Sequence, residues 1–413
     1  MTGTMVIREG YLRQLRAGRG LHSVVKIIMG VRRCGKSTLV EQYIHELRSE
    51  GIPEDHIILI DLEDRRNQHI RDKDTLNDIL TELIPDDQCF VFLDELQNVE
   101  GWEMTVAAMC NRGNVDLYVT GSNGYLLSSE LSTHITGRYV EIRMLPLSFH
   151  EYSALRSGLG DNTELLSLYL KYGGLPMVDP SLGKTFCMSL LEGIVDSVIN
   201  KDVSSRSKTP NSSTVERIAR FLYSNIGNES NMRSISKGSG LSQNTVEKYV
   251  RGMLNAGIFE HAEKYDIIGK KLLNTNGKYY AADLGMRNAS LGGTQGTDMS
   301  RPLENIVYLE LLRRGYTVRV GSYGNTEVDF TATIDDRTEF YQVCQTLMSE
   351  GTREREIRSY RMMRNSHRRF ILTLDRLGIG NDDGVEIVNI IDWLLDDGID
   401  PKVVPAPERW MEM

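Results

Sequence analysis

Short apolar runs alternate with helix-like stretches through the first third of this chain. Each run has the length of a single strand: VVKIIM (24–29), IILIDLE (57–63), CFVFLDE (89–95), VDLYVTGS (115–122) and RYVEIRML (138–145). The stretches between them, such as 37–51 and 76–84, have the spacing of amphipathic helices. This alternation predicts an α/β fold in which a parallel sheet is covered by helices on both faces.

The pattern changes after Pro146, where the strand signals stop. Helical periodicity continues to about residue 202, a polar stretch at 204–213 resembles a linker, and mixed helix and strand signals return near residue 300. A length of 413 residues fits two to four domains. We therefore expect an α/β core, a helical segment, a second helical region and a mixed C-terminal region, at 1–148, 149–205, 206–290 and 291–413.

Charge and cysteine content narrow the class of protein. The net charge of -9 argues against a chain that coats nucleic acid by bulk charge, but eight acids against one arginine between Thr373 and Asp400 supply most of it. The five cysteines form no CxxC pair, which argues against a disulfide framework or a zinc site and favours the reducing cytoplasm. No signal peptide and no apolar stretch of membrane-spanning length is apparent, so we expect no membrane partner.

Residues 30–37 read GVRRCGKS, which fits the pattern G-x-x-x-x-G-K-[ST] between an apolar strand and a helix. Gly30 and Gly35 permit backbone angles that aim successive N–H groups into one concavity, where a phosphate can bind. Lys36 can reach the β- and γ-phosphates of ATP, and the Ser37 hydroxyl can ligate Mg²⁺. We assign nucleotide binding to Gly30, Arg33, Cys34, Gly35, Lys36, Ser37 and Thr38.

Two carboxylates end the third apolar run, at Asp94 and Glu95. Ligands of parallel sheets bind at the carboxyl ends of the strands. Asp94 suits a role on Mg²⁺, and Glu95 suits a general base that polarises the attacking water. An apolar strand that ends in acid is common, so this pair gains weight from its position about 60 residues after the phosphate loop.

Two further positions fit the same chemistry. Ser122 and Asn123 follow the fourth strand, where a small polar side chain would lie beside the γ-phosphate. Arg138 precedes the fifth strand, where it could point into the site of a neighbouring subunit and stabilise transition-state charge. The alternative for Arg138 is a surface salt bridge.

Taken together, these segments resemble an AAA+-type P-loop ATPase. They resemble more narrowly a bacterial and archaeal family that joins such an ATPase to a C-terminal region of formerly unknown function. The resemblance is carried by segments across nearly the whole chain: KIIMGVRRCGKSTL (26–39), FLDELQNVEGWE (92–103), 118–152, YGGLP (172–176), KYYAADLGMRN (278–288), ENIVYLELLRRGY (304–316) and EVDF (327–330).

The resemblance implies roles for several residues. It implies that Ser122 or Asn123 senses the third phosphate, that Arg138 is an arginine finger, and that the Gly174-Leu175-Pro176 turn belongs to a helical lid and contacts the adenine. An arginine finger that acts in trans implies a homo-oligomer, often a ring such as a hexamer.

Residues 214–262 fit a winged-helix pattern with a turn at Gly240 and a helix at 242–255. If this module binds DNA, the first polar residues of that helix meet the base edges. The candidates are Gln243, Asn244, Lys248 and Arg251. The alternative is a protein-interaction or structural module.

The last region is similar in order to the PD-(D/E)XK nuclease core, with Glu304 on a helix and Asp329 on a strand. That core continues with E-x-K on the next strand, but here the segment reads Gln342-Val343-Cys344. Glutamine lacks the charge that binds metal, and cysteine cannot replace the ammonium, so we expect the fold to remain without the cleavage chemistry.

Seven arginines against two glutamates follow between residues 353 and 369. Arg355 and Arg358 are candidates for contacts to a DNA backbone, because guanidinium groups match phosphate oxygens. The alternative is a solvated helix face with internal salt bridges.

The sequence thus favours an ATPase that uses ATP and Mg²⁺ and drives DNA binding or remodelling in a motor-like manner, with branched DNA among the candidate substrates. Two alternatives remain open: a nucleotide-switched regulatory or scaffold protein that binds other proteins, and an ATP-regulated nuclease.

Overall fold

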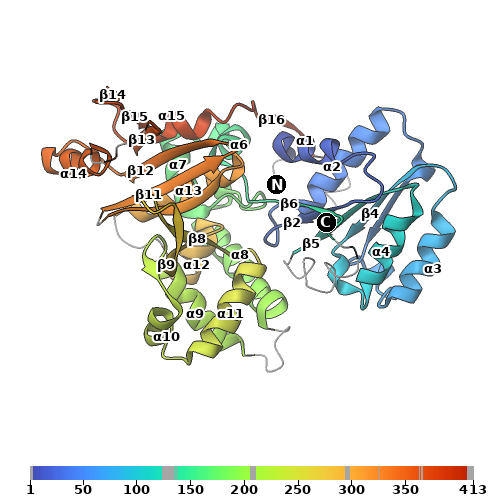
Figure 1. Ribbon diagram of the computed structural model, residues 1–413. Helices are drawn as coiled ribbons and strands as arrows, with labels where there is room; N and C mark the ends of the chain where they lie inside the picture. Colours follow the sequence, from blue (N-terminus) through green and yellow to red (C-terminus); the bar gives the residue numbers. More distant parts are fainter. Residues whose placement is uncertain are drawn as a thin grey trace. The chain divides into compact units, whose positions relative to one another are not determined.

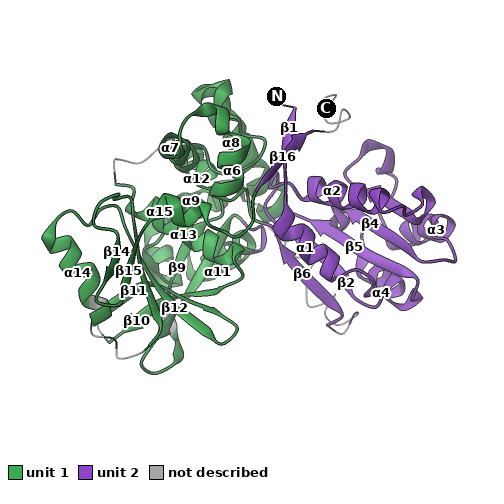
Figure 2. Ribbon diagram, turned by 90° about the horizontal axis from the view of Figure 1, so that it is seen from above, with its two compact units in different colours: residues 1–2, 145–254, 258–400 green, residues 3–144, 255–257, 401–413 purple. Residues whose placement is uncertain are grey.

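The computed structural model describes residues 3–122, 135, 137–204, 211–293, 298–324, 326–361, 363 and 366–406. The chain forms two compact units, which Figure 2 distinguishes by colour. The N-terminal unit consists of Gly3–Met144 with Asn255–Gly257 and Pro401–Met413, and the C-terminal unit consists mainly of Leu145–Leu254 and Ile258–Asp400.

A parallel sheet forms the centre of the N-terminal unit (Figure 1). Its strand order within the described residues is β3-β4-β5-β2-β6. The strands are β2 (Val25–Met29), β3 (Ile57–Asp61), β4 (Cys89–Asp94), β5 (Val115–Gly121) and β6 (Tyr139–Arg143). The helices around them are α1 (Glu9–Ala17), α2 (Lys36–Ser49), α3 (Lys73–Leu83) and α4 (Trp102–Arg112), with 3-10 turns η1 (Glu54–His56), η2 (Arg65–Asn67) and η3 (Leu96–Asn98). Separately, β1 (Thr4–Ile7) pairs antiparallel with β16 (Lys402–Pro405).

Both faces of this sheet are buried under helices, as the continuous apolar runs predict. On one face, Val25 and Ile27 of β2 pack in a core with Leu80 of α3 and Val106 of α4. On the other face, Tyr43 of α2 contacts Phe92 and Tyr118, with ring centroids 6.2 and 5.3 Å away. The predicted parallel α/β core is therefore confirmed.

Helices dominate the first part of the C-terminal unit. Three of them start at capping boxes, which satisfy free N–H groups of the first turn: Ser148 with Glu151, Asp161 with Glu164, and Asn231 with Ser234. The helices are α6 (Phe149–Leu155), α7 (Asn162–Tyr172), α8 (Lys184–Ser197), α9 (Ser212–Ser224), α10 (Met232–Ser239), α11 (Gln243–Asn255) and α12 (Leu284–Ser290), with short turns η5 (Ser157–Leu159) and η6 (Pro180–Leu182) and a π-helix η7 (Val198–Ser204).

A second sheet runs through the rest of the C-terminal unit. In the part of the chain that the structure describes it has nine strands, in the order β14-β15-β13-β12-β11-β10-β8-β9-β7. The strands are β7 (Glu229–Ser230), β8 (Phe259–Asp266), β9 (Lys271–Ala281), β10 (Thr317–Tyr323), β11 (Thr326–Ile334), β12 (Arg337–Cys344), β13 (Arg368–Thr373), β14 (Gly380–Asp382) and β15 (Val385–Asn389). The accompanying helices are α13 (Ser300–Arg313), α14 (Glu350–Arg361) and α15 (Ile390–Leu395).

The pairing of β8 joins two regions that are separate in the sequence. β8 pairs antiparallel with β9 on one side and parallel with β10 on the other. The division of residues 149–413 into three modules stays a prediction, and this pairing places strands of the last two in one sheet. Among the described residues, no helix combines the length and the apolar character needed to cross a membrane.

Candidate active site

The predicted phosphate loop joins β2 to α2 in the N-terminal unit. Gly35 has a φ of 105° and Arg33 a φ of 68°, so both adopt left-handed backbone angles that help to curl the loop. Gly30 allows a close approach, because a Cβ atom there would lie 2.2 Å from the Met144 carbonyl oxygen. The loop leads directly into the N-terminus of α2, which favours a bound anion.

Lys36 is buried at the start of α2. Its ammonium lies 3.2 Å from the Gly30 carbonyl oxygen and 3.5 Å from Glu95 Oε1. Burial alone would lower the pKa of Lys36, but Glu95, Cys34 and Asp94 together raise it above its ordinary value. The side chain is therefore a fixed positive charge beside the phosphate loop.

Asp94 is buried at the carboxyl end of β4. The hydroxyl of Thr120, at the end of the neighbouring strand β5, donates a hydrogen bond to Asp94 Oδ1, and the Ser37 side chain also bonds to this carboxylate. Burial raises the pKa of Asp94, although these two hydrogen bonds oppose the shift. Ser37 and Asp94 are thus brought together as the sequence predicted for a metal pair.

A hydroxyl and a carboxylate are the hard oxygen ligands that Mg²⁺ prefers, so this pair fits the ion. No group of three or more His, Cys, Asp or Glu side chains in the described residues could hold a metal ion. Mg²⁺ bound here would therefore take its other ligands from water and phosphate, as it commonly does.

Glu95 is buried beside Lys36 and has a φ of 55°, which is unusual for a residue other than glycine. Its backbone N–H donates to Thr120 Oγ1 at 3.1 Å, and Gln97 Nε2 donates to its Oε2. Burial alone would raise the pKa of Glu95, but the Lys36 charge and the Gln97 hydrogen bond bring it below its ordinary value. Glu95 is therefore held as a carboxylate, the form that a general base requires.

Ser122, Asn123 and Thr38 were also predicted to belong to this site. Ser122 is buried after β5, and its Oγ lies 3.4 Å from Gln97 Nε2. Asn123 lies outside the described residues. Thr38 is half-buried in the first turn of α2.

Arg138 precedes β6 and donates to Asn111 Oδ1 at 3.0 Å and to the Ile135 carbonyl at 3.1 Å. Because β6 runs parallel to β2 with Tyr139 opposite Val25, Arg138 lies at the amino end of the sheet. Gly30 follows the carboxyl end of β2. Within its own unit, Arg138 is therefore at the edge opposite the phosphate loop.

Three contacts of this site were missed by the sequence reasoning. Arg8 is buried and donates from NH1 to the carbonyl of Cys34 at 3.3 Å, and so supports the loop from outside the motif. Thr120 and Gln97 each contact a predicted carboxylate. Thr120 could have been suggested by its place at the end of the apolar run 115–122, whereas Arg8 has no comparable signal in the sequence.

The YGGLP turn (172–176) contacts Asp283, which lies in the segment KYYAADLGMRN (278–288). The N–H of Gly174 donates to Asp283 Oδ2 at 2.7 Å, and a Cβ atom on Gly173 would lie 2.1 Å from Asp283 Oδ1. The carbonyl of Pro176 accepts from Arg156 NH2 at 3.0 Å. These glycines therefore allow a close contact with α12, while the adenine contact of Pro176 stays a prediction.

The nuclease-like residues gather around a lysine that the motif does not contain. Lys278 of β9 is buried, and its Nζ lies 2.8 Å from Glu304 Oε1, 2.7 Å from Glu327 Oε1 and 3.9 Å from Asp329 Oδ1. Burial and the nearby Glu304 carboxylate raise the pKa of Asp329 to about 8. Gln342 accepts from the Asp329 N–H at 3.2 Å.

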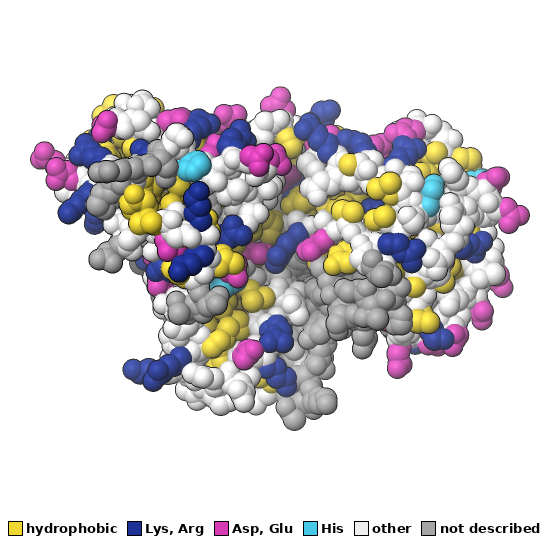
Figure 3. Space-filling view, in the orientation of Figure 1, with side chains coloured by type: hydrophobic (Ala, Val, Ile, Leu, Met, Phe, Trp, Pro, Cys, Tyr) yellow, Lys and Arg dark blue, Asp and Glu magenta, His cyan; other side chains and the backbone are white. Residues whose placement is uncertain are grey.

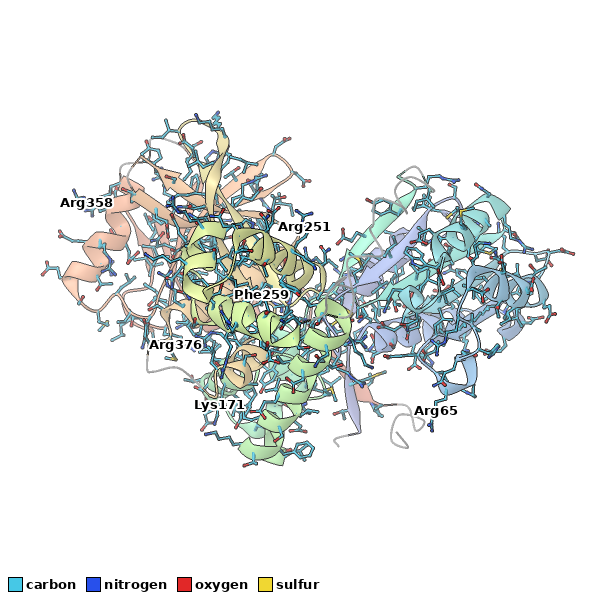
Figure 4. The ribbon with its side chains drawn as sticks, turned by 90° about the horizontal axis from the view of Figure 1, so that it is seen from below. Arg65, Lys171, Arg251, Phe259, Arg358 and Arg376 are labelled. Atoms are coloured by element: carbon cyan, nitrogen blue, oxygen red, sulfur yellow. The ribbon has the colours of Figure 1, made fainter. Side chains whose placement is uncertain are left out.

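The predicted DNA-contacting residues lie on two helices of the C-terminal unit, and Figure 4 shows Arg251 projecting from α11 and Arg358 from α14. The four candidates on α11 are exposed: Gln243, Asn244, Lys248 and Arg251. Arg355 and Arg358 on α14 are exposed as well, and Arg355 pairs with Glu356 at 2.9 Å.

Comparison with known proteins identifies the type of domain in the N-terminal unit. A family model described as an AAA domain matches residues 22–153, and a model described as a domain of unknown function matches residues 163–297. An uncharacterized protein of Haemophilus influenzae is 36% identical over 410 residues, which cover 96% of this chain and 100% of that protein. An uncharacterized protein of Methanocaldococcus jannaschii is 28% identical over 392 residues, 89% of this chain and 85% of that protein.

Solved structures share the fold only distantly. A Walker-type ATPase of Pyrococcus abyssi is 16% identical with a TM-score of 0.47, over 69% of this chain and 95% of that chain. The replication initiator DnaA bound to AMPPCP and single-stranded DNA is 15% identical with a TM-score of 0.31, over 59% of this chain and 86% of that chain. The assignment therefore rests on the AAA match and on the Haemophilus relative. The chain carries an AAA-type P-loop ATPase domain and belongs to the same family as the uncharacterized Haemophilus influenzae protein.

Proposed function

We propose that this protein hydrolyses ATP with Mg²⁺ and couples the hydrolysis to DNA binding or remodelling. The observation that carries the proposal is the convergence of three groups in the N-terminal unit. Lys36 lies 3.5 Å from Glu95, and Ser37 is hydrogen-bonded to Asp94. A cation, a metal-binding pair and a general base are the parts that phosphoryl transfer to water needs.

Each group has a separate task in the proposed reaction. Mg²⁺, held by Ser37 and Asp94, would neutralise charge on the β- and γ-phosphates. Lys36 would bind the same phosphates through its ammonium. Glu95 accepts the proton of the attacking water, because its carboxylate is ionised in the folded protein.

The order of elements in residues 212–281 is that of a winged helix and so supports the DNA-binding part of the proposal. Three helices, α9, α10 and α11, are followed by the hairpin β8–β9, and β7 pairs with β9. Figure 3 shows basic side chains over α10 and α11. The exposed basic residues of these helices and of the hairpin tip are Arg233, Lys237, Lys248, Arg251, Lys270 and Lys271. Glu247 is the acid on α11, and it pairs with Arg251 at 2.9 Å.

The arginine-rich stretch around α14 is a weaker DNA surface than its sequence suggests. Arg353 pairs with Asp382 at 2.6 Å, and Arg368 pairs with Glu386 at 3.0 Å. The acidic residues that follow in the sequence therefore neutralise part of this basic surface. We accordingly place the main DNA contact on α11 and keep α14 as a secondary candidate.

The cluster around Lys278 argues against metal-dependent cleavage in the C-terminal region. The Lys278 ammonium already compensates the carboxylates of Glu304 and Glu327. A metal ion would have to displace a buried lysine, which would leave that lysine without its partners at a cost of several kcal/mol, of order 3–5. The ATP-regulated nuclease is thus the less favoured reading.

The decisive experiment measures ATP hydrolysis with single-stranded, duplex and branched DNA. We expect DNA to stimulate the rate, most strongly for one of these shapes. Glu95→Gln should lower kcat by about 10²–10⁴, the usual contribution of a general base, and should still bind ATP. Glu82→Gln, an exposed glutamate on α3, is the matched control.

Two results would count against the proposal. Normal turnover by Glu95→Gln would remove the role of that residue. A rate that is unchanged by every DNA shape would favour the regulatory or scaffold protein instead.

A further inference from the structure

Gln97 lies next to the candidate base but belongs to neither predicted motif. It is in the turn η3, two residues after Glu95. Its Nε2 donates to Glu95 Oε2 and lies 3.4 Å from Ser122 Oγ. Its Oε1 is buried and accepts no hydrogen bond from the described residues. One amide therefore links the end of β4 to the end of β5.

The direction of this amide follows from the charge of Glu95. Nitrogen and oxygen of a glutamine side chain are distinguished by their hydrogen bonds. The Lys36 ammonium lies 3.5 Å from Glu95 Oε1, and a carboxylate beside a cation accepts hydrogen bonds with both oxygens, so Oε2 faces the NH₂ end of the amide. An amide turned the other way would place a carbonyl oxygen against a carboxylate.

Both oxygens of Glu95 are engaged in this structure, Oε1 by Lys36 at 3.5 Å and Oε2 by Gln97. A lysine of the phosphate loop binds β- and γ-phosphates when ATP is present. The attraction of Lys36 to phosphate would then release Oε1 for the attacking water, while Gln97 keeps its hold on Oε2.

We propose that Gln97 is the positioning residue of the ATPase reaction: it fixes the Glu95 carboxylate for attack and ties its orientation to Ser122. This inference rests on the proposed hydrolysis of ATP. The unsatisfied Oε1 gives it independent support, because a buried acceptor without a donor is unfavourable and is better placed where a bound molecule can satisfy it.

Gln97→Met tests the inference, because methionine has nearly the same length but no donor. We expect kcat to fall about 10- to 100-fold, less than the 10²–10⁴ of the base itself, with little change in the Kd for ATP. A fall in kcat without a change in the Kd for ATP is the result that a positioning role predicts, because the contacts of Gln97 are to Glu95 and Ser122. Gln68→Met, at an exposed position in the same unit, is the control.

A merely structural role would lower kcat and ATP affinity together. An unchanged kcat in Gln97→Met, or a loss of kcat matched by an equal loss of ATP affinity, would overturn the inference. If that variant does not fold, Gln97→Asn provides the second test, since it retracts the amide by one methylene and should lower kcat with the same unchanged Kd.

Failure of the proposed function is distinguishable from failure of this inference. Wild-type protein that binds but never hydrolyses ATP would remove the proposed function alone. A crystal structure of Gln97→Met without nucleotide then tests the inference. A Glu95 carboxylate that leaves its wild-type orientation supports the link between the two side chains, and an unchanged orientation overturns it.

Discussion

Five residues other than glycine have positive φ angles in the described part of the chain. Three of them, Lys270, Asp335 and Asp383, lie in turns between adjacent strands, where such angles are common. The other two, Arg33 and Glu95, adjoin the candidate active site. A left-handed angle costs a residue with a Cβ atom about 1–2 kcal/mol, so this strain is concentrated where loops must present groups to a ligand.

Asp283 makes the stability of the C-terminal unit depend on pH. Burial raises its pKa to about 6, although backbone N–H groups from Met286 and Gly174 oppose the shift. Between about pH 4 and pH 6 the unfolded chain loses this proton while the folded chain keeps it, so stability falls as the pH rises. The shift of about two units corresponds to about 3 kcal/mol.

Chemical denaturation of wild-type protein and of Asp283→Asn at several pH values checks this expectation. The free energy of unfolding of the wild type should fall, relative to the variant, by about 3 kcal/mol between pH 4 and pH 7. Asp336→Asn, at an exposed turn, controls for the loss of one carboxylate. If the free energy of unfolding varies with pH in the same way in the wild type and in Asp283→Asn, the burial of this carboxyl group has no such effect.

The sequence identified the residues of the site more readily than their partners. Lys36 could be predicted from its place in the phosphate-loop motif. Asp94 and Glu95 could be predicted because they end an apolar run, and the carboxyl ends of parallel strands meet at one edge. Thr120 was harder to assign, because its contact with Asp94 depends on β4 and β5 being neighbours. Gln97 gave no signal, since its contacts follow from the left-handed turn at Glu95.

At the scale of elements, α11 and α14 offer different surfaces to a nucleic acid. The two helices α10 and α11 together carry one acidic residue, whereas arginines near α14 pair with acids of β14 and β15. Ion pairs within the protein compete with phosphate for the same guanidinium groups. Affinity for DNA should therefore depend more on α11.

Lys248→Ala tests this difference. Loss of one phosphate contact should weaken DNA binding about equally for all sequences and reduce the slope of log K against log salt by about one. Fluorescence anisotropy at several salt concentrations measures both quantities, with Lys184→Ala, an exposed lysine on α8, as the control. A larger loss for Arg358→Ala than for Lys248→Ala would move the assignment to α14.

At the scale of the whole molecule, local patterns predicted the first sheet better than the second. The five apolar runs became the five strands of the parallel sheet, because each run is long enough for one buried strand. The contact between β8 and β10 joins segments about 50 residues apart, and no local periodicity encodes such a partner. No local periodicity indicates the partners of Lys278 either: it comes from β9 and lies among carboxylates of α13 and β11.

The position of Arg138 bears on assembly. Since it lies at the sheet edge opposite its own phosphate loop, it can assist hydrolysis only in another copy of the chain. Arg138→Ala should then lower kcat by about 10³, as for other arginine fingers, and Lys36→Ala should lose nucleotide binding.

Mixing these two inactive variants should restore part of the ATPase rate, because Lys36→Ala subunits still carry Arg138. Energy transfer between labelled subunits confirms that the variants exchange. Exchange without recovered activity would rule out action in trans, and the hydrogen bond to Asn111 would remain as the role of Arg138.

The use of both edges of β8 also limits how this chain can be truncated. β8 pairs with β9 on one edge and with β10 on the other. A fragment that ends before β10 would leave one edge of β8 open, and open edges invite pairing with other chains. Such a fragment should therefore aggregate more readily than the full chain.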